Sequence, residues 1–151
     1  MPSIAKLLKP KLVTLNIKAA EKSAAISSLC ELISQNNKCD AEALFNTIMN
    51  RESLQSTAVG HGVALPHARC DVDDFIVAAA VSEKGMDFNS IDKLPVNIVF
   101  LIISPKNETS SYLQTLSQIA ALLSNEKIRS ELVSAKTPEE FIEIVKKNER
   151  R

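Results

Sequence analysis

Two nearly continuous apolar segments, residues 76–81 and 96–103, constrain the fold more than any other feature of the sequence. Each has the length of a strand and is bounded by polar or turn-forming residues, which is typical of strands covered on both faces. We therefore expect both segments in the middle of a sheet. The glycine within 82–88 predicts a turn, and residues 90–95 are expected to form a loop. The connection between the two apolar segments leaves little room for a helical crossover, which predicts a mixed sheet.

Periodic apolar patterns outside these segments predict one further strand and a series of helices. The expected elements are an opening strand over 13–17, helices over 25–33, 41–49, 109–123 and 128–132, and a terminal helix that begins at 138. The strand is indicated by the alternation of apolar and polar residues, and the helices by apolar residues at helical spacing. Asp40 and Thr137 are candidate N-caps, the latter followed by a proline at the first helical position.

This order of elements predicts a single α/β domain over residues 1–151. We expect a three-layer sandwich in which a central mixed β-sheet is flanked by helices. A doubly wound, purely parallel fold is disfavoured because the middle strands follow one another too closely for helical crossovers.

Composition excludes several classes of function. Lys and Arg together number 18, as do Asp and Glu, so the formal net charge is zero and no overall field favours nucleic acid or an anionic membrane. The three cysteines contain no CxxC pair, which argues against a zinc site or a disulfide scaffold and favours a reduced cytoplasmic location. The longest apolar run is too short to cross a bilayer, so no membrane insertion is expected. We expect no metal and no cofactor.

The stretch GHGVALPHAR, residues 60–69, holds both histidines and two of the three glycines. Gly60 and Gly62 permit a tight loop that leads into a short strand over 63–65. Pro66 is expected to stop that strand and to present His67 at its end. A neutral imidazole is both a nucleophile and a base, although histidines also serve structural roles, and composition alone leaves both interpretations open.

Residues 51–69 closely resemble the active-site signature of enzyme IIA domains of the fructose/mannitol type in the bacterial phosphoenolpyruvate-dependent phosphotransferase system. The resemblance is closest to the stand-alone nitrogen-type enzyme IIA. The matching residues are Arg51, Ser56, Thr57, Gly60, Gly62, Pro66 and His67. The resemblance covers nearly the whole chain and implies a mixed sheet flanked by helices, in agreement with the sandwich predicted from the residues.

The resemblance implies a phosphotransferase component that carries a phosphoryl group in a relay rather than a stand-alone turnover catalyst. His67 would accept the phosphoryl group from an HPr-like histidine phosphocarrier protein. Arg51 would bind the phosphate, although a solvated charge at a helix end is the alternative. Tyr112 stands where many relatives have a second histidine; its hydroxyl would bind the phosphate, although packing on an apolar helix face is an open alternative. We expect a surface role for His61.

Three functions follow from the resemblance. The favoured one is a regulatory, nitrogen-type protein acting on an unknown target, because the chain holds neither a cysteine-loop enzyme IIB unit nor a transmembrane enzyme IIC unit. The second is a sugar-transport enzyme IIA that phosphorylates a separate enzyme IIB. The third is a protein-interaction module that has lost phosphotransfer, for which Tyr112 is the main argument. A cysteine nucleophile at Cys70, with His67 as its base, is disfavoured, and the effect of Arg69 on docking of the donor is left open.

Overall fold

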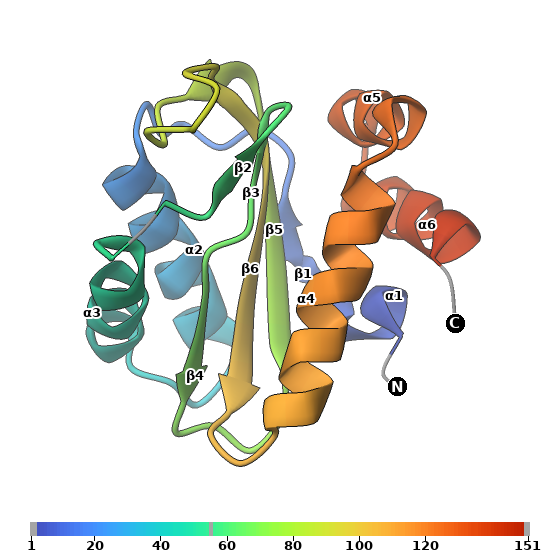
Figure 1. Ribbon diagram of the computed structural model, residues 1–151. Helices are drawn as coiled ribbons and strands as arrows, with labels where there is room; N and C mark the ends of the chain where they lie inside the picture. Colours follow the sequence, from blue (N-terminus) through green and yellow to red (C-terminus); the bar gives the residue numbers. More distant parts are fainter. Residues whose placement is uncertain (1–2, 55, 150–151) are drawn as a thin grey trace.

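The computed structural model describes residues 3–54 and 56–149 of the chain. A mixed six-stranded sheet forms the middle layer, and helices cover both of its faces (Figure 1). The elements in chain order are α1 (Ile4–Leu7), β1 (Leu8–Thr14), α2 (Lys22–Asn36), α3 (Ala41–Glu52), β2 (Ala58–Gly60), β3 (Val63–Ala64), β4 (His67–Cys70), β5 (Ile76–Met86), β6 (Val96–Pro105), α4 (Thr109–Leu123), α5 (Glu126–Ser134) and α6 (Pro138–Asn148). The predicted three-layer sandwich is confirmed.

The sheet has the strand order β1-β5-β6-β3-β2, and β4 pairs with β6 beside this path. The long middle strands β5 and β6 are antiparallel, whereas β3 and β4 both run parallel to β6. Strand β1 runs parallel to β5. The sheet is therefore mixed, and the two apolar segments of the sequence form its centre as predicted.

Alternate residues of the middle strands face two separate cores. On β5, Ala78 and Ala80 face the core beneath α2 and α3, whereas Val77, Ala79 and Val81 face the core beneath the other helices. Figure 1 shows α2 and α3 on one side of the sheet and α1, α4, α5 and α6 on the other. Burial on both faces explains why residues 76–81 of this strand are apolar without a polar alternation.

The predicted helix starts are confirmed by their capping hydrogen bonds. The Asp40 side chain accepts a hydrogen bond from the Glu42 amide at 3.2 Å, and the Thr137 hydroxyl accepts one from the Glu140 amide at 3.1 Å. Both contacts satisfy amides that have no partner within the helix. None of the described helices is long and apolar enough to cross a lipid bilayer.

The prediction of an opening strand over 13–17 is wrong in its bounds, and it missed α1. The first strand, β1, ends at Thr14, and its pairing with β5 shifts register between Leu8 and Val13. Residues 9–11 in this irregular stretch are all exposed, so the start of the strand lacks the alternation of apolar and polar residues that predicts a strand. Leu15 and Ile17 lie on the following connection and pack against different cores, so their alternation does not mark a strand.

The turn predicted within 82–88 is also wrong, because β5 continues to Met86. Met86 still pairs with Val96 of β6, and the register between β5 and β6 shifts between Val81 and Met86. The glycine therefore lies in an irregular part of a strand that continues beyond it. The loop expected over 90–95 is confirmed.

Candidate functional site

His67 lies at a break in the strand that borders β6. Val63 and Ala64 of β3 pair with β6, and His67 begins β4, which pairs with the same strand further along. Pro66 separates the two pieces, and its carbonyl oxygen accepts a hydrogen bond from the Ile102 amide at 3.0 Å. The predicted strand does end before Pro66, but the expectation that His67 would lie at its end is corrected: pairing with β6 resumes after the proline, so His67 opens a new strand.

A backbone hydrogen bond sets the orientation of the His67 ring. The distance between Nδ1 of His67 and the carbonyl oxygen of Leu65 is 2.6 Å. A carbonyl oxygen can only accept, so Nδ1 carries the proton when the ring is neutral. The lone pair is then on Nε2. A neutral imidazole held in this tautomer is a nucleophile with one defined reactive nitrogen.

The glycine loop upstream adopts the tight turn that the sequence predicts. Gly60 and Gly62 have φ angles of +96° and +80°, and His61 between them has φ of +58°. The His61 amide donates to the Asp92 carboxylate at 2.9 Å, and the His61 side chain is exposed. His61 is not among the residues that line the pocket at His67.

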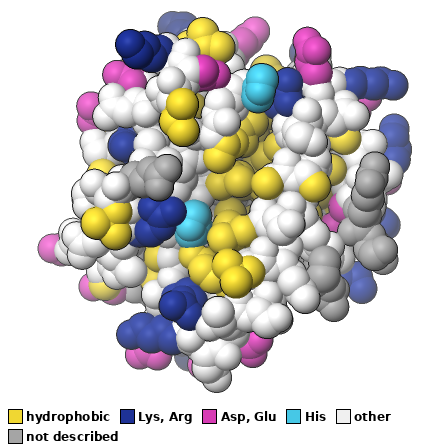
Figure 2. Space-filling model, in the orientation of Figure 1, with side chains coloured by type: hydrophobic (Ala, Val, Ile, Leu, Met, Phe, Trp, Pro, Cys, Tyr) yellow, Lys and Arg dark blue, Asp and Glu magenta, His cyan; other side chains and the backbone are white. Residues whose placement is uncertain are grey.

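His67 lies in an open pocket of about 590 Å³ between α3 and α4. The residues that line the pocket are Thr47, Arg51, His67, Ala68, Arg69, Lys106 and Tyr112. Three of these side chains are cationic and none is acidic, so the pocket favours an anion. Figure 2 shows on this face a histidine between a cationic side chain and a band of hydrophobic side chains. All three site residues predicted from the sequence, His67, Arg51 and Tyr112, line this pocket.

Tyr112 contacts His67 and orders a second arginine. The two ring centroids are 5.7 Å apart, with 62° between the ring planes. The Arg69 guanidinium lies 5.9 Å from the centroid of the Tyr112 ring and donates from Nη1 to the Thr109 hydroxyl at 2.7 Å. Burial raises the pKa of Tyr112, against the opposing effect of Arg51 and Arg69. The phenol therefore keeps its proton at neutral pH and can donate a hydrogen bond into the pocket.

Burial also keeps His67 neutral. It lowers the pKa of His67 below the ordinary value, and the positive charge of Arg51 lowers it further. The hydrogen bond to Leu65 and the negative charge of Glu52 raise the pKa of His67 and oppose these effects. Because the net shift is downward from a value of about 6.5, the ring is mostly uncharged at neutral pH.

The sequence prediction missed Lys106 and Glu52. Lys106 follows β6 directly, and it meets Arg69 only because β4 runs parallel to β6. The position of Lys106 directly after a long apolar strand could have identified it as a site residue, because polar side chains at the carboxyl ends of strands often contribute to binding sites. Glu52 is the last residue of α3, where a glutamate is expected in solvent, yet it is 2% exposed.

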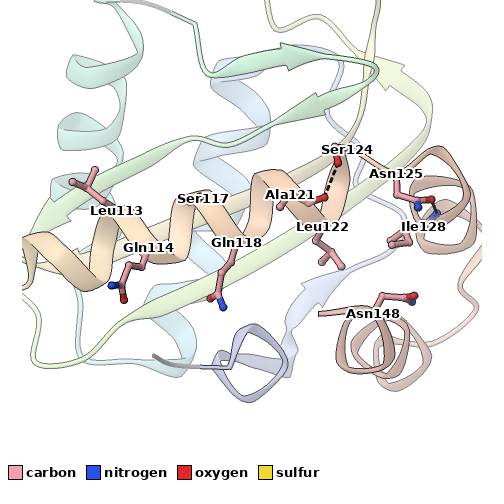
Figure 3. Close-up of a pocket in the computed structure, with 10 residues that line it drawn as sticks. All are labelled: Leu113, Gln114, Ser117, Gln118, Ala121, Leu122, Ser124, Asn125, Ile128 and Asn148. Atoms are coloured by element: carbon pink, nitrogen blue, oxygen red, sulfur yellow. Dashed lines mark hydrogen bonds between the residues drawn. The ribbon is translucent and has the colours of Figure 1, made fainter. Parts of the chain in front are cut away.

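A larger hollow, of about 730 Å³, lies along α4 towards α5 and α6 (Figure 3). The residues that line it are Leu113, Gln114, Ser117, Gln118, Ala121, Leu122, Ser124, Asn125, Ile128 and Asn148. None of these side chains is ionisable, so this hollow supplies no charged group or general base. The smaller pocket at His67, in contrast, is lined by ionisable side chains.

The chain is similar in sequence to known proteins. A family model described as "Phosphoenolpyruvate-dependent sugar phosphotransferase system, EIIA 2" matches residues 6–148. The chain is 32% identical over 149 residues to the PTS system fructose-specific EIIABC component of Bacillus subtilis, covering 97% of this chain and 24% of that protein. It is 30% identical over 147 residues to the nitrogen regulatory protein of Pseudomonas aeruginosa, covering 96% of each. The chain thus spans about a quarter of the first relative and nearly all of the second.

Solved structures share the fold. The nitrogen regulatory protein IIA-Ntr of Neisseria meningitidis superposes with a TM-score of 0.89 at 27% identity, covering 94% of this chain and 98% of that one. The mannitol IIA of Escherichia coli superposes with a TM-score of 0.78 at 22% identity, covering 91% and 98%. At the latter identity the likeness establishes the fold alone.

Replacing Arg51 with methionine should raise the pKa of His67, because a nearby positive charge disfavours the imidazolium form. Arg51→Lys keeps the charge and should leave the pKa of His67 close to that of the wild type. NMR titration of the ring protons measures both, and a His61→Asn variant assigns the two sets of signals. An unchanged or lower pKa in Arg51→Met would show that the guanidinium does not act on the ring.

Proposed function

Because the chain belongs to the EIIA 2 family of the phosphoenolpyruvate-dependent sugar phosphotransferase system, we propose that it is a phosphohistidine carrier that uses Nε2 of His67. The donor is an HPr-like histidine phosphocarrier protein. The observation that carries the proposal is the hydrogen bond between Nδ1 of His67 and the Leu65 carbonyl oxygen, which leaves Nε2 unprotonated in a cationic pocket.

The transfer needs positioning and charge compensation rather than a metal. Nε2 of His67 attacks the phosphorus of the donor phosphohistidine in line, the new N–P bond forms, and the old N–P bond returns its electron pair to the donor ring. The phosphoryl group carries its negative charge into a pocket already lined by Arg51, Arg69 and Lys106. These cations are in place before transfer, so stabilising the charge requires little rearrangement.

Arg51 and Tyr112 have distinct roles in this proposal. The Arg51 guanidinium donates to the equatorial phosphate oxygens, for which its planar fork is well suited. The Tyr112 hydroxyl donates one neutral hydrogen bond, and the Tyr112 ring also packs against the imidazole in a T-shaped contact. Unlike the second histidine of many relatives, a tyrosine cannot become positively charged, so it stabilises the phosphorylated state less.

A protein donor requires a surface around the pocket as well as the pocket itself. Leu113, adjacent to Tyr112 on α4, is 58% exposed, and Leu54, just beyond Arg51 and α3, is 82% exposed. Exposed apolar side chains beside a charged pocket are typical of protein-binding sites. The band of hydrophobic side chains on this face in Figure 2 fits the same role.

The proposed role of the carrier is mainly regulatory. The support is that the Pseudomonas nitrogen regulatory protein and the Neisseria IIA-Ntr structure match over nearly their whole lengths. The second candidate, a transport enzyme IIA that phosphorylates a separate enzyme IIB, is favoured by the 32% identity to the fructose-specific component of Bacillus subtilis. Rapid phosphoryl transfer to a fructose-type enzyme IIB would favour the second candidate over the first.

The full chain, incubated with phosphoenolpyruvate, enzyme I and an HPr-type phosphocarrier, should gain one acid-labile phosphoryl group by intact mass. His67→Ala should gain none, because the accepting nitrogen is lost, and the matched variant His61→Ala should behave as the wild type. An adduct on His67→Ala would refute the site. A wild-type chain that gains no adduct would favour the interaction module without phosphotransfer.

Tyr112→Phe should slow phosphorylation by roughly twofold to tenfold, the effect of losing one neutral hydrogen bond, because the ring packing remains. Tyr112→His should phosphorylate at least as fast as the wild type, since it supplies a donor that can be charged. Quenched-flow rates with one donor preparation measure both. A Tyr112→Phe rate equal to that of the wild type would assign Tyr112 to packing alone.

A further inference from the structure

Glu52 is a buried carboxylate with a complete set of donors. It is the last residue of α3 and is 2% exposed. Lys22 of α2 donates to Oε2 at 3.2 Å, and the Thr57 amide lies 3.2 Å from both carboxylate oxygens. The Thr57 hydroxyl also donates to Oε1. The carboxylate therefore joins α2, the end of α3 and the segment that leads into the glycine loop.

Stability alone does not account for this arrangement. Removing a carboxylate and an ammonium from water is costly, and apolar residues of similar volume usually serve a core as well or better. A negative charge in the last turn of a helix also opposes the helix dipole. A buried carboxylate at this position is better explained by the geometry that it imposes on Thr57.

Thr57 connects Glu52 to the reactive ring by backbone hydrogen bonds. Its carbonyl oxygen accepts from the Leu65 amide at 3.0 Å. The Leu65 carbonyl oxygen accepts in turn from Nδ1 of His67 at 2.6 Å. The next peptide, between Pro66 and His67, is held by β6, because the Pro66 carbonyl oxygen accepts from the Ile102 amide. The orientation of the Leu65 carbonyl therefore depends on Thr57 at one end and on β6 at the other.

We propose that Glu52 is a positioning residue for His67. Its carboxylate orders Thr57 and, through the carbonyl oxygens of Thr57 and Leu65, keeps the ring proton on Nδ1 and Nε2 free in the pocket. This role rests on the proposed phosphotransfer function, but its structural part, the choice of ring tautomer, is present in the unphosphorylated protein.

The test is Glu52→Gln, which keeps the size of the side chain but replaces one acceptor oxygen with an NH2 group. That group cannot accept from Thr57 or Lys22. Long-range ¹H–¹⁵N spectra of the ring nitrogens should show only the Nδ1–H tautomer of His67 in the wild type and a population of Nε2–H in the variant. Phosphorylation by the HPr-type donor should slow by about tenfold or more, since hydrogen bonds to a charged group are lost.

Glu149→Gln is the matched control. Glu149 accepts from the Ser3 hydroxyl at 2.5 Å and from the Ile4 amide at 2.8 Å, and it does not line the pocket at His67. The same chemical change there should lower stability without altering the His67 tautomer or the phosphorylation rate. Thr57→Ser, which keeps both donors, should also match the wild type.

A folded Glu52→Gln variant with the wild-type tautomer and rate would overturn the proposal. If Glu52→Gln does not fold, Thr57→Val is the deciding variant, because it removes only the hydroxyl donor to Glu52. It should shift the His67 tautomer towards Nε2–H to a smaller extent. A Thr57→Val protein with the wild-type tautomer would then overturn the proposal. If the wild type is not phosphorylated, the proposed function fails, while the ring spectra of the two chains still decide the positioning role.

Discussion

The site depends on the parallel pairing of β6 with a strand that a proline divides. β3 and β4 lie along the same edge of β6, and the carbonyl oxygen of Pro66 continues the hydrogen bonding across the break. The Leu65 amide donates to the Thr57 carbonyl oxygen, and the Leu65 carbonyl oxygen holds Nδ1 of His67. This hydrogen bond leaves the partly buried His67 ring with one unprotonated nitrogen, Nε2.

The positive and negative charges near the His67 ring lie at different depths in the protein. Arg51, Arg69 and Lys106 line the open side, whereas the carboxylate of Glu52 lies in the interior behind the loop. The cations lower the free energy of an anion that arrives from solvent, and Arg51 together with burial keeps the unphosphorylated ring neutral. The interior carboxylate moderates this effect on the ring without occupying the anion pocket. In the proposed transfer, the same pocket suits a neutral nucleophile before the step and a negatively charged product after it.

The sequence predicted the fold well where neighbouring residues alone determine the local structure. Burial on both faces makes residues 76–81 of β5 and 98–103 of β6 apolar, and side chains next to the helix starts, such as Asp40 and Thr137, cap the helices directly. The errors fall where a register shift interrupts a strand. The beginning of β1 and the end of β5 both contain such shifts, and the pairing partner that holds those segments extended is distant in sequence. A pattern search cannot detect that partner.

By itself the sequence determined the two central strands, the long helices and their order, the mixed central sheet, and the residues that identify the family, from Arg51 to His67. Those properties depend on local propensity, on periodicity and on a contiguous motif. Only the tertiary structure decided that His67 opens a strand, that its proton is on Nδ1, and that Lys106 and Arg69 share its pocket. It also decided that Glu52 is buried against Lys22, thirty positions earlier in the chain. These facts arise from hydrogen bonds and charges between segments that meet only after the sheet has formed, and the spacing of residues along the chain does not encode them.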